Sequence, residues 1–409
     1  MTIPTTTPVT AGTAARWAGS SALESDRMEL TIQQADLAFG VSKALASVSS
    51  KSPLPLLSCV LLEAEADGLR ITGTDLDVTT SVLLPCAVKK PGRAAVNARR
   101  FNDVVRKMSK GEVSLAVVKS ECEVRYGGGK GWSKFPTQDP ADFPRIPKLE
   151  AEAAISIEGD ALARLIARSG YAASNEETRP QLNGVLLQCT AQQITLVATD
   201  GHRLSRSERT GQFAAFKSDG VIIPNRALTA ISRAAEDATS PVTIEVAGGR
   251  NQAGFSTQIG AYRVQVLTRL LEGPYPNYEQ VIPKNNPREV KCARTDLMEA
   301  VDIVASHADN VTRQVRFTLR QNSLGVSSAT DNGSGEHSLA AEYTGDDMDI
   351  GYNAGYLMDL LRALPTESIV LKLNSALSAG VIEPVGPLPQ AEESMLCLIM
   401  PLRLPDATA

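Results

Sequence analysis

The sequence is poor in residues that build metal and redox sites. It has three histidines and six cysteines in 409 residues, and no Cys-x-x-Cys pair. No histidine stands with cysteines or acids at the spacing of a zinc site. The cysteines are scattered, and Cys59, Cys189 and Cys397 lie in apolar runs typical of strands. We therefore expect buried thiols in a reducing compartment, with no metal and no cofactor.

The sequence also lacks the segments that direct proteins into membranes or out of the cell. No apolar run approaches the roughly 20 residues that span a bilayer. The start has no basic region followed by an apolar core, as a secretory signal would. Residues 1–27 are instead rich in Thr, Ala, Ser and Gly, which predicts a disordered extension. Together these features predict a cytoplasmic protein with no membrane partner.

An excess of positive charge is also missing. The formal net charge is −5 at pH 7. This value argues against broad, nonspecific coating of nucleic acid. It leaves room for a local basic surface, so the distribution of the cations matters more than their sum.

The motifs of a nucleophilic enzyme are absent as well. Asp200, His202 and Ser205 fall within the stretch ATDGHRLS. Catalytic triads are usually assembled from distant segments, and no Gly-x-Ser-x-Gly elbow surrounds Ser205. A turn built on Asp-Gly, with Gly201 in an unusual backbone conformation, accounts for the same letters. An enzyme remains one alternative at this point.

The sequence contains an internal repeat with three copies. Residues 57–82, 182–208 and 315–342 each read as an apolar strand, a polar turn, a second strand ending in Thr-Asp, and a third alternating segment. The Thr-Asp pairs start at 74, 199 and 330. A period of this length indicates three similar domains along the chain.

Two helices repeat in step with these strands. Residues 35–48, 160–173 and 295–308 have helical spacing before each Thr-Asp unit, and Asp160 and Thr295 are candidate N-caps. Residues 94–108, 221–235 and 349–364 each join a strand to an amphipathic helix, for which Asn97 and Asn353 suit the cap. Strands broken by two helices predict an α+β class, with helices on one face of antiparallel sheet.

The chain resembles a known family, the bacterial sliding clamp or beta subunit of DNA polymerase III. The resemblance is carried by LPLLSCVLLEA, PADFPRIP, LVATDGHRLS, YPNYEQVIPK, MDIGYNAGYLMDLLRAL and the terminal MPLRL, and spans residues 28–404. It implies an N-terminal extension (1–27), clamp domains at 28–148, 149–284 and 285–404, and a C-terminal tail (405–409). It also implies a DNA-clamp fold, with antiparallel sheets outside and two helices per domain lining a ring.

The function implied by the resemblance is not catalytic. The family forms a head-to-tail homodimeric ring around double-stranded DNA and holds it without sequence preference. The ring tethers the alpha subunit of DNA polymerase III for processive synthesis, and it is served by a clamp loader and by other proteins that carry a clamp-binding motif.

The resemblance also implies a pocket between the second and third domains, where partners insert a short, partly apolar peptide. Its residues carry over as Leu182, Thr199, Gly201, His202, Arg203, Leu204, Pro276, Val281, Leu398, Met400, Pro401, Leu402, Arg403 and Leu404. Leucines, prolines and a methionine suit an apolar depression with a polar rim. For Leu398 and Leu404, ordinary strand packing is an equal alternative. Gln280 departs from the family, which often has an arginine there.

DNA contacts are expected from dispersed cations, because phosphate is held without reading bases. The candidates are Lys51, Arg99, Arg100, Arg106, Lys107, Arg164, Arg168, Arg179, Arg226 and Arg233. A solvated helix face is the alternative for each of them. For the ring contact, the strand KGWSKF offers Trp132 and Phe135 as anchors. Its partner edge cannot be identified from the sequence.

Two alternatives stay open besides an enzyme. One is a specialised or inhibitor-resistant paralogue of the clamp, which the N-terminal extension and the tail allow. The other is a monomeric scaffold that has lost ring closure. The molecular mass in solution separates this last alternative from a ring.

Overall fold

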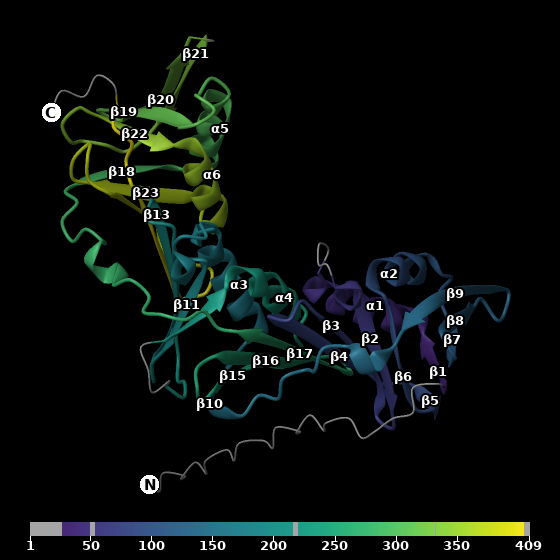
Figure 1. Cartoon of the computed structure of the whole chain (residues 1–409). Coiled ribbons are helices and arrows are strands. Elements are labelled where there is room, and N and C mark those ends of the chain that lie inside the picture. The colour runs from purple at the N-terminus through teal and green to yellow at the C-terminus, as the bar shows by residue number, and fades with distance from the viewer. Residues whose placement is uncertain (1–26, 50–53, 216–219, 332, 405–409) are drawn as a thin grey trace, which may run out of the picture.

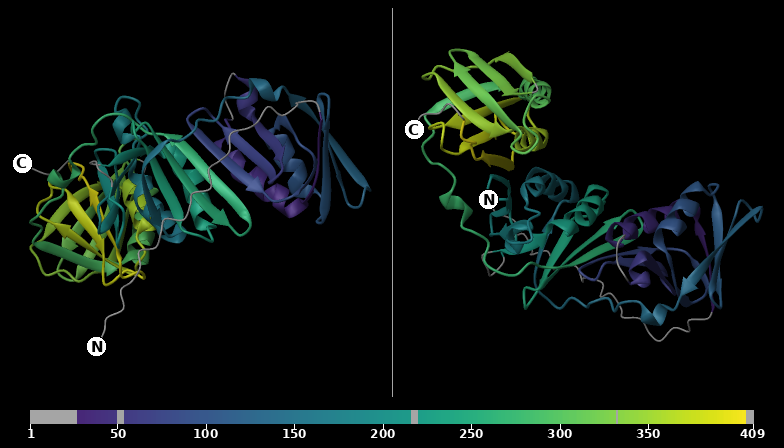
Figure 2. Two further views of the ribbon diagram at one scale, coloured as in Figure 1. Left: turned by 90° about the horizontal axis from the view of Figure 1, so that it is seen from below. Right: turned by 45° about the horizontal axis from the view of Figure 1, so that its top comes forward.

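The computed structural model describes residues 27–49, 54–215, 220–331 and 333–404. Three domains follow one another along an arc, with the third turned upward from the other two (Figure 1). The six helices of these residues lie on the inner side of the arc, and the sheets form its outer side (Figures 1 and 2). The predicted residues 1–26, Lys51 and the tail 405–409 lie outside the described residues.

The first domain contains two helices and nine strands. In chain order they are β1 (Arg27–Gln33), α1 (Gln34–Ala44), β2 (Cys59–Glu65), β3 (Gly68–Thr74), β4 (Val78–Leu84), β5 (Ala87–Lys90), β6 (Gly92–Asn97), α2 (Ala98–Lys107), β7 (Glu112–Val118), β8 (Glu121–Tyr126) and β9 (Gly131–Gln138). The buried side chains of both helices pack into the core formed by the strands.

The second domain repeats this order. It consists of β10 (Ala151–Ile157), α3 (Gly159–Ser169), β11 (Gly184–Cys189), β12 (Gln193–Thr199), β13 (Arg203–Thr210), β14 (Val221–Pro224), α4 (Asn225–Glu236), β15 (Val242–Ala247), β16 (Gln252–Ile259) and β17 (Tyr262–Arg269). By position in the repeat, β13 corresponds to β4, and β17 corresponds to β9.

The third domain repeats the order again. It consists of β18 (Arg288–Ala293), α5 (Arg294–Ala305), β19 (Gln314–Arg320), β20 (Ser323–Thr330), β21 (Gly333–Ala340), β22 (Met348–Asn353), α6 (Ala354–Ala363), β23 (Ser368–Leu373), β24 (Gly380–Pro384) and β25 (Glu393–Ile399). Here β21 holds the place of β4 and β13, and β25 holds the place of β9 and β17.

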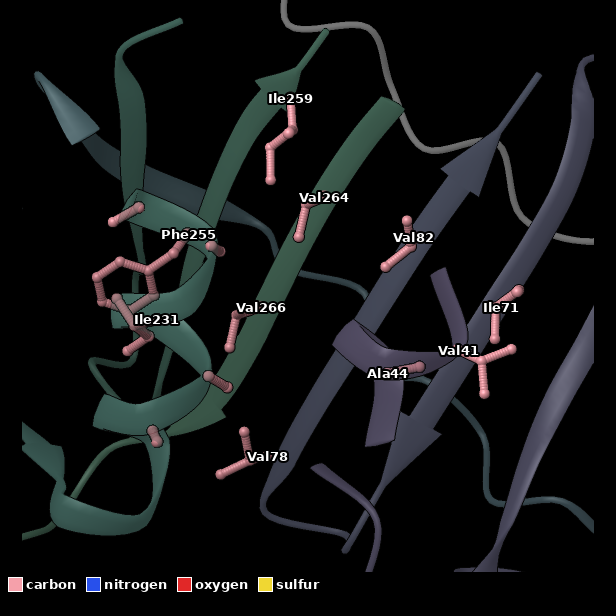
Figure 3. Packing of buried hydrophobic residues seen from close by; sticks show 14 of the residues in the cluster. Val41, Ala44, Ile71, Val78, Val82, Ile231, Phe255, Ile259, Val264 and Val266 are labelled. Carbon is pink, nitrogen blue, oxygen red and sulfur yellow. The ribbon is translucent and has the colours of Figure 1, made fainter. Parts of the chain in front are cut away.

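Neighbouring domains are joined edge to edge by strands. At the first junction β17 pairs antiparallel with β4, which places Val264 opposite Val82 within one 13-stranded sheet. Beneath this pair, Val78, Val266 and Ile231 belong to a core that continues from domain to domain (Figure 3). The junction is therefore part of a hydrophobic core.

The second junction is built in the same way. Strand β25 pairs antiparallel with β13 from Arg203 opposite Ile399 to Arg209 opposite Glu393, within an eight-stranded sheet. The remaining sheet has four strands, in the order β21-β20-β19-β22. Its end strand, β21, is a free edge among the described residues.

Several local predictions are confirmed. The side chains of Asn97 and Asn353 cap α2 and α6 by accepting from backbone N–H groups at 3.1 Å. Cys59, Cys189 and Cys397 are buried strand thiols. The predicted caps Asp160 and Thr295 are wrong, because each lies inside the first turn of its helix.

Candidate functional site

The stretch ATDGHRLS folds into a tight turn between β12 and β13. The Thr199 hydroxyl donates to the Arg203 carbonyl at 2.7 Å, and one carboxylate oxygen of Asp200 accepts from the backbone N–H of His202 and of Arg203, each at 2.9 Å. Gly201 has φ +90°, which a side chain would strain. Ser205 is buried and donates to the carbonyl of Arg168. The acid and the hydroxyl thus serve the fold and form no catalytic cluster.

This turn meets the C-terminal segment and the closing segment of the second domain. The backbone N–H of Met400 donates to the His202 carbonyl at 2.8 Å. Leu204 lies opposite Leu398 in the β13–β25 pair. Both leucines belong to one apolar cluster, against which Tyr275 and Ile282 pack. The structure therefore brings together segments that lie about 75 and 200 residues apart in the sequence.

The predicted pocket residues differ in their exposure. Leu182, Leu204, Leu398 and Leu404 are buried, Thr199, Arg203, Pro401 and Leu402 are half-buried, and Gly201, His202, Pro276, Val281, Met400 and Arg403 are exposed. Val281 and Met400 are 56% and 40% exposed, which is high for apolar side chains. Apolar side chains that are exposed together favour contact with other proteins.

The last residues of the described chain are held by the third domain. The Leu402 N–H donates to the Gly351 carbonyl at 2.8 Å, and the Gln314 side chain donates to the Arg403 carbonyl at 3.0 Å. This anchoring leaves the Met400 side chain exposed beside the turn at His202.

Arg203 differs from the rim group expected from the sequence. Its guanidinium donates to Asp200 at 3.1 Å, to Asp359 on α6 at 2.7 Å and to the Tyr171 carbonyl at 2.8 Å. Its side chain is only 10% exposed. These contacts hold the Arg203 guanidinium between the second domain and the third.

Tyr356 is a residue of this site that the sequence reasoning missed. It lies on α6, with its ring 4.6 Å from the Arg203 guanidinium and 6.1 Å from the His202 imidazole at an interplanar angle of 20°. Burial, followed by the charge of Asp200, raises the pKa of its hydroxyl above the ordinary value. To predict this contact from the sequence, one would have to know that α6 packs beside the turn at His202.

Arg179 also lies at this site. Its side chain pairs with Glu176 at 2.7 Å. One of its guanidinium nitrogens is 3.0 Å from the place where a side chain on Gly201 would begin. Arg179 therefore lies on a loop beside the turn at Gly201.

The cations of α2 are placed as a DNA-contacting face would require. Arg99, Arg100, Arg106 and Lys107 are exposed, while Phe101 and Val105 hold the helix to the core. On α4, Arg226 and Arg233 are exposed too, although Arg226 pairs with Asp77 at 2.7 Å. Lys51 lies outside the described residues.

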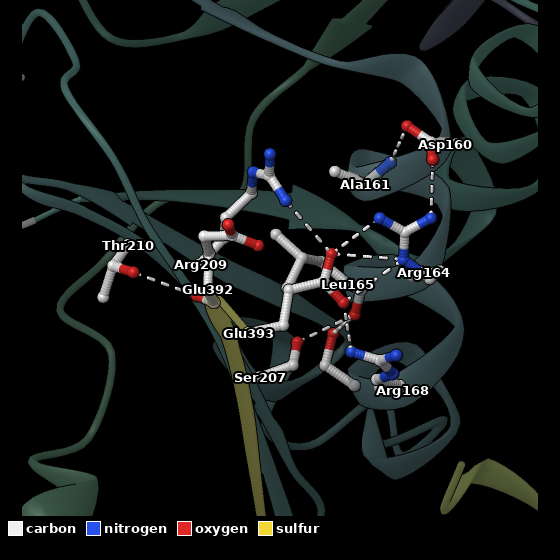
Figure 4. Close-up of polar contacts among 11 residues, drawn as sticks. Asp160, Ala161, Arg164, Leu165, Arg168, Ser207, Arg209, Thr210, Glu392 and Glu393 are labelled. Carbon is white, nitrogen blue, oxygen red and sulfur yellow. Dashed lines mark hydrogen bonds and ion pairs between the residues drawn. The ribbon is translucent and has the colours of Figure 1, made fainter. Parts of the chain in front are cut away.

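Arg164 and Arg168 were expected to face DNA, and this is wrong. Both bind Glu393 at the start of β25, at 2.7 and 2.5 Å, and Arg209 joins them at 3.3 Å (Figure 4). The Glu393 side chain is fully buried. Burial raises its pKa, but the bonds from Arg164 and Arg168 outweigh this and leave the pKa lowered. The two arginines therefore connect the second domain to the third.

Only one of the two expected ring anchors is exposed. Trp132 on β9 is 60% exposed. Phe135 is 6% exposed and packs edge-on against Phe101 at 5.1 Å between ring centroids. The Phe135 ring thus belongs to the core of the first domain.

The repeated unit, the sheets that continue between domains and the inner helices define a three-domain DNA-clamp fold, as expected. Residues 28–147, 156–277 and 279–403 match the N-terminal, central and C-terminal domains of the DNA polymerase III beta subunit. The chain belongs to the DNA polymerase III beta subunit family, the beta sliding clamps, which are non-catalytic processivity factors.

Individual relatives agree with this assignment. A beta sliding clamp of Synechocystis sp. is 32% identical, covering 92% of this chain and 100% of the relative. One of Escherichia coli is 26% identical, covering 92% and 100%. The crystal structure of a sliding clamp from Bartonella birtlesii, bound to griselimycin, has a TM-score of 0.84 and 28% identity, covering 92% and 100%. No helix among the described residues is long and apolar enough to cross a membrane.

Proposed function

We propose that two copies of this chain close head to tail into a ring around duplex DNA and tether the replicative polymerase. The observation that carries this proposal is a pair of strand edges that have no partner domain within the chain, although the corresponding edges at both domain junctions are paired. Strands β4 and β13 each pair with the last strand of the following domain, β17 and β25. Their third counterpart is β21, and the last strand of the first domain is β9.

The leftover edges lie at opposite ends of the chain. Strand β21 ends the four-stranded sheet, and most of β9 pairs on one side only, with β8. Two head-to-tail contacts of β21 with β9 would close a ring of two subunits. Edge strands left unpaired favour association with another chain, which supports this arrangement.

The ring would hold DNA through its inner helices. The exposed cations of α2 and of α4 support sequence-independent phosphate contacts, with no base readout. Replacing Arg99, Arg100, Arg106 and Lys107 by alanine should lower DNA loading, because phosphate-binding charge is removed while the buried face stays intact. The proposed ring acts in a cytoplasmic replication complex.

The junction site would receive partner peptides. The exposed side chains of Met400 and Val281 support this role, as does the relative whose crystal structure is bound to griselimycin. The proposed partners are the alpha subunit of DNA polymerase III, the clamp loader and other proteins with a clamp-binding motif. A short peptide with glutamine, leucine and a terminal aromatic pair should bind with affinity on the order of micromolar, because it buries little surface and must be ordered.

Retention on circular DNA tests the ring directly. The chain, loaded onto nicked circular DNA, should remain bound in salt that removes electrostatic binders and should leave when the circle is linearised. Equal retention on linear and circular DNA would refute encirclement.

A further inference from the structure

The turn between β3 and β4, at the first domain junction, has the same hydrogen bonds as the turn at His202. The Thr74 hydroxyl donates to the Val78 carbonyl at 3.2 Å. One carboxylate oxygen of Asp75 accepts from the backbone N–H of Asp77 and of Val78, at 3.0 and 2.7 Å. The two turns are thus equivalent in structure, although they differ in sequence.

The last strands of the two junctions end against these turns in the same way. The Arg269 N–H at the end of β17 donates to the Asp77 carbonyl at 2.9 Å, as the Met400 N–H after β25 donates to the His202 carbonyl at 2.8 Å. Arg269 therefore takes the place of Met400, and Asp77 takes the place of His202. The first junction repeats the framework of the proposed peptide site, with a charged pair where the second junction has an imidazole and a thioether.

A small depression lies at this turn and is built from the same parts as the second junction. Its lining includes Thr79 and Leu267, which lie opposite each other in the β4–β17 pair as Leu204 and Leu398 do in the β13–β25 pair. Pro147, from the segment that closes the first domain, also lines it. A turn, two paired strands and a closing segment thus meet at the first junction as well.

Leu76 gives this depression an exposed apolar side chain. It lines the depression, is 47% exposed, and has φ +83°, a left-handed conformation that is unfavourable for leucine. The equivalent residue of the second junction is Gly201, which adopts φ +90° without a side chain. Strained residues cluster at functional sites, and an exposed apolar group favours contact with another molecule. Leu76 therefore marks the depression as a contact site.

Two arginines beside the depression share one carboxylate. Asp77 lies 2.7 Å from Arg226 on α4 and 3.8 Å from Arg269. The Arg269 side chain is 67% exposed, so its guanidinium is open to a further partner. Because one carboxylate faces two guanidinium groups, an added carboxylate would complement the charge that remains.

We propose that the first junction is a second peptide-binding site, which takes an acidic, partly apolar segment of a partner protein. An apolar side chain of the peptide would contact Leu76 and Pro147, and a neighbouring carboxylate would bind Arg269. The charge at Arg269 identifies an acidic segment as the occupant. The inference rests on the peptide role proposed for the second junction and gives each copy of the chain two docking sites with different preferences.

Titration of a labelled peptide, acetyl-Ser-Asp-Leu-Asp-Leu-Gly-amide, against the full chain tests this site. Binding should be weak, with a dissociation constant on the order of 100 μM, because a short peptide buries little surface. Leu76→Gly and Arg269→Gln should each weaken it by at least about fivefold, since each removes one of the two anchors. Leu76→Gly relieves the backbone strain at this turn, so the fold is retained.

Arg263→Gln is the matched control, because Arg263 is a partly exposed arginine on the same strand as Arg269. This variant and Met400→Ala should leave the affinity for the acidic peptide unchanged. A peptide with glutamine, leucine and a terminal aromatic pair should show the opposite pattern, weakened by Met400→Ala and unaffected by Leu76→Gly.

The two peptides separate the two sites. An acidic peptide that binds equally well to the Leu76→Gly and Arg269→Gln variants, or that does not bind at about 1 mM, would overturn the second site. An aromatic peptide that ignores Met400→Ala would instead overturn the peptide role of the second junction.

Discussion

Removing the charge of Glu393 should loosen the junction between the second and third domains. Three arginines converge on this fully buried carboxylate, and Arg168 is itself only 6% exposed (Figure 4). Glu393→Gln keeps the volume but leaves the guanidinium groups without a counter-ion. Breaking one partner out of a buried ion pair costs about 3–5 kcal/mol. We expect about 3 kcal/mol, the lower end, because Arg164 retains Asp160 at 2.7 Å and Arg209 retains Glu158 at 3.1 Å.

Amide hydrogen exchange measures this cost locally. Exchange of the β25 and β13 amides should speed up by about a hundredfold if opening is governed by this junction, since 1.4 kcal/mol corresponds to a factor of ten. Glu392→Gln, a change at the exposed neighbouring acid, should leave exchange unaltered. Partner-peptide affinity should fall in Glu393→Gln, because β25 carries the segment at Met400. Unchanged exchange in β25 would refute the reasoning that the buried charge holds the junction.

The same group sets a pH dependence. The pKa of Glu393 is lowered in the folded chain because the arginine bonds outweigh burial. A lowered carboxyl pKa contributes stability that is present above the unfolded-state pKa and is lost as pH falls through the folded-state pKa. The β25 amides should therefore stay protected through the ordinary titration range of glutamate and lose protection only below it. Loss of protection on raising the pH would contradict this sign.

Three further substitutions have defined outcomes. Gly201→Ala should destabilise the chain by about 1 kcal/mol or more, measured by thermal unfolding, because φ is +90° and the new Cβ would press on Arg179. Leu76→Gly should be neutral or stabilising by up to about 1 kcal/mol in the same assay, because Leu76 adopts φ +83° at the matching turn. Met400→Ala should weaken a labelled peptide by about 1–3 kcal/mol in a titration without changing the mass of the assembly.

Local patterns predicted most of the fold correctly. Helical spacing located the six α-helices of the described residues, and the Thr-Asp pairs located the turns that precede β4 and β13. The incorrect cap predictions show that these patterns do not define the first residue of a helix. The Asp160 carboxylate accepts from the N–H of Ala161 and pairs with Arg164, so an acid near a helix start can serve the first turn without ending it. Whether such an acid caps the helix depends on where the helix begins to within one or two residues, and sequence patterns do not define helix ends that closely.

The different exposure of the two predicted ring residues follows from strand geometry. Side chains alternate between the two faces of a strand, so Trp132 and Phe135, three residues apart, point to opposite faces. At most one of them can lie on the outer surface of β9. The structure buries Phe135 against Phe101 and exposes Trp132.

No pattern in the sequence indicates that Arg164 and Arg168 pair with Glu393. Arg164 and Arg168 lie four residues apart on one helix face, which suited either DNA or solvent. Their partner, Glu393, lies 229 and 225 residues further along the chain, in a segment without any motif. A charge on a helix can be assigned only when the elements packed against it are known, and those come from tertiary structure.

The junctions explain why the repeat is visible in the sequence while its contacts are not. The leucines at 37, 162 and 297 are conserved in type within the chain because each fills the same kind of core. The residue two places later must match whatever the neighbouring strand presents, so it is aromatic opposite Tyr262 and basic opposite Glu393. Repetition thus preserves the position of a contact and leaves its chemistry free to differ.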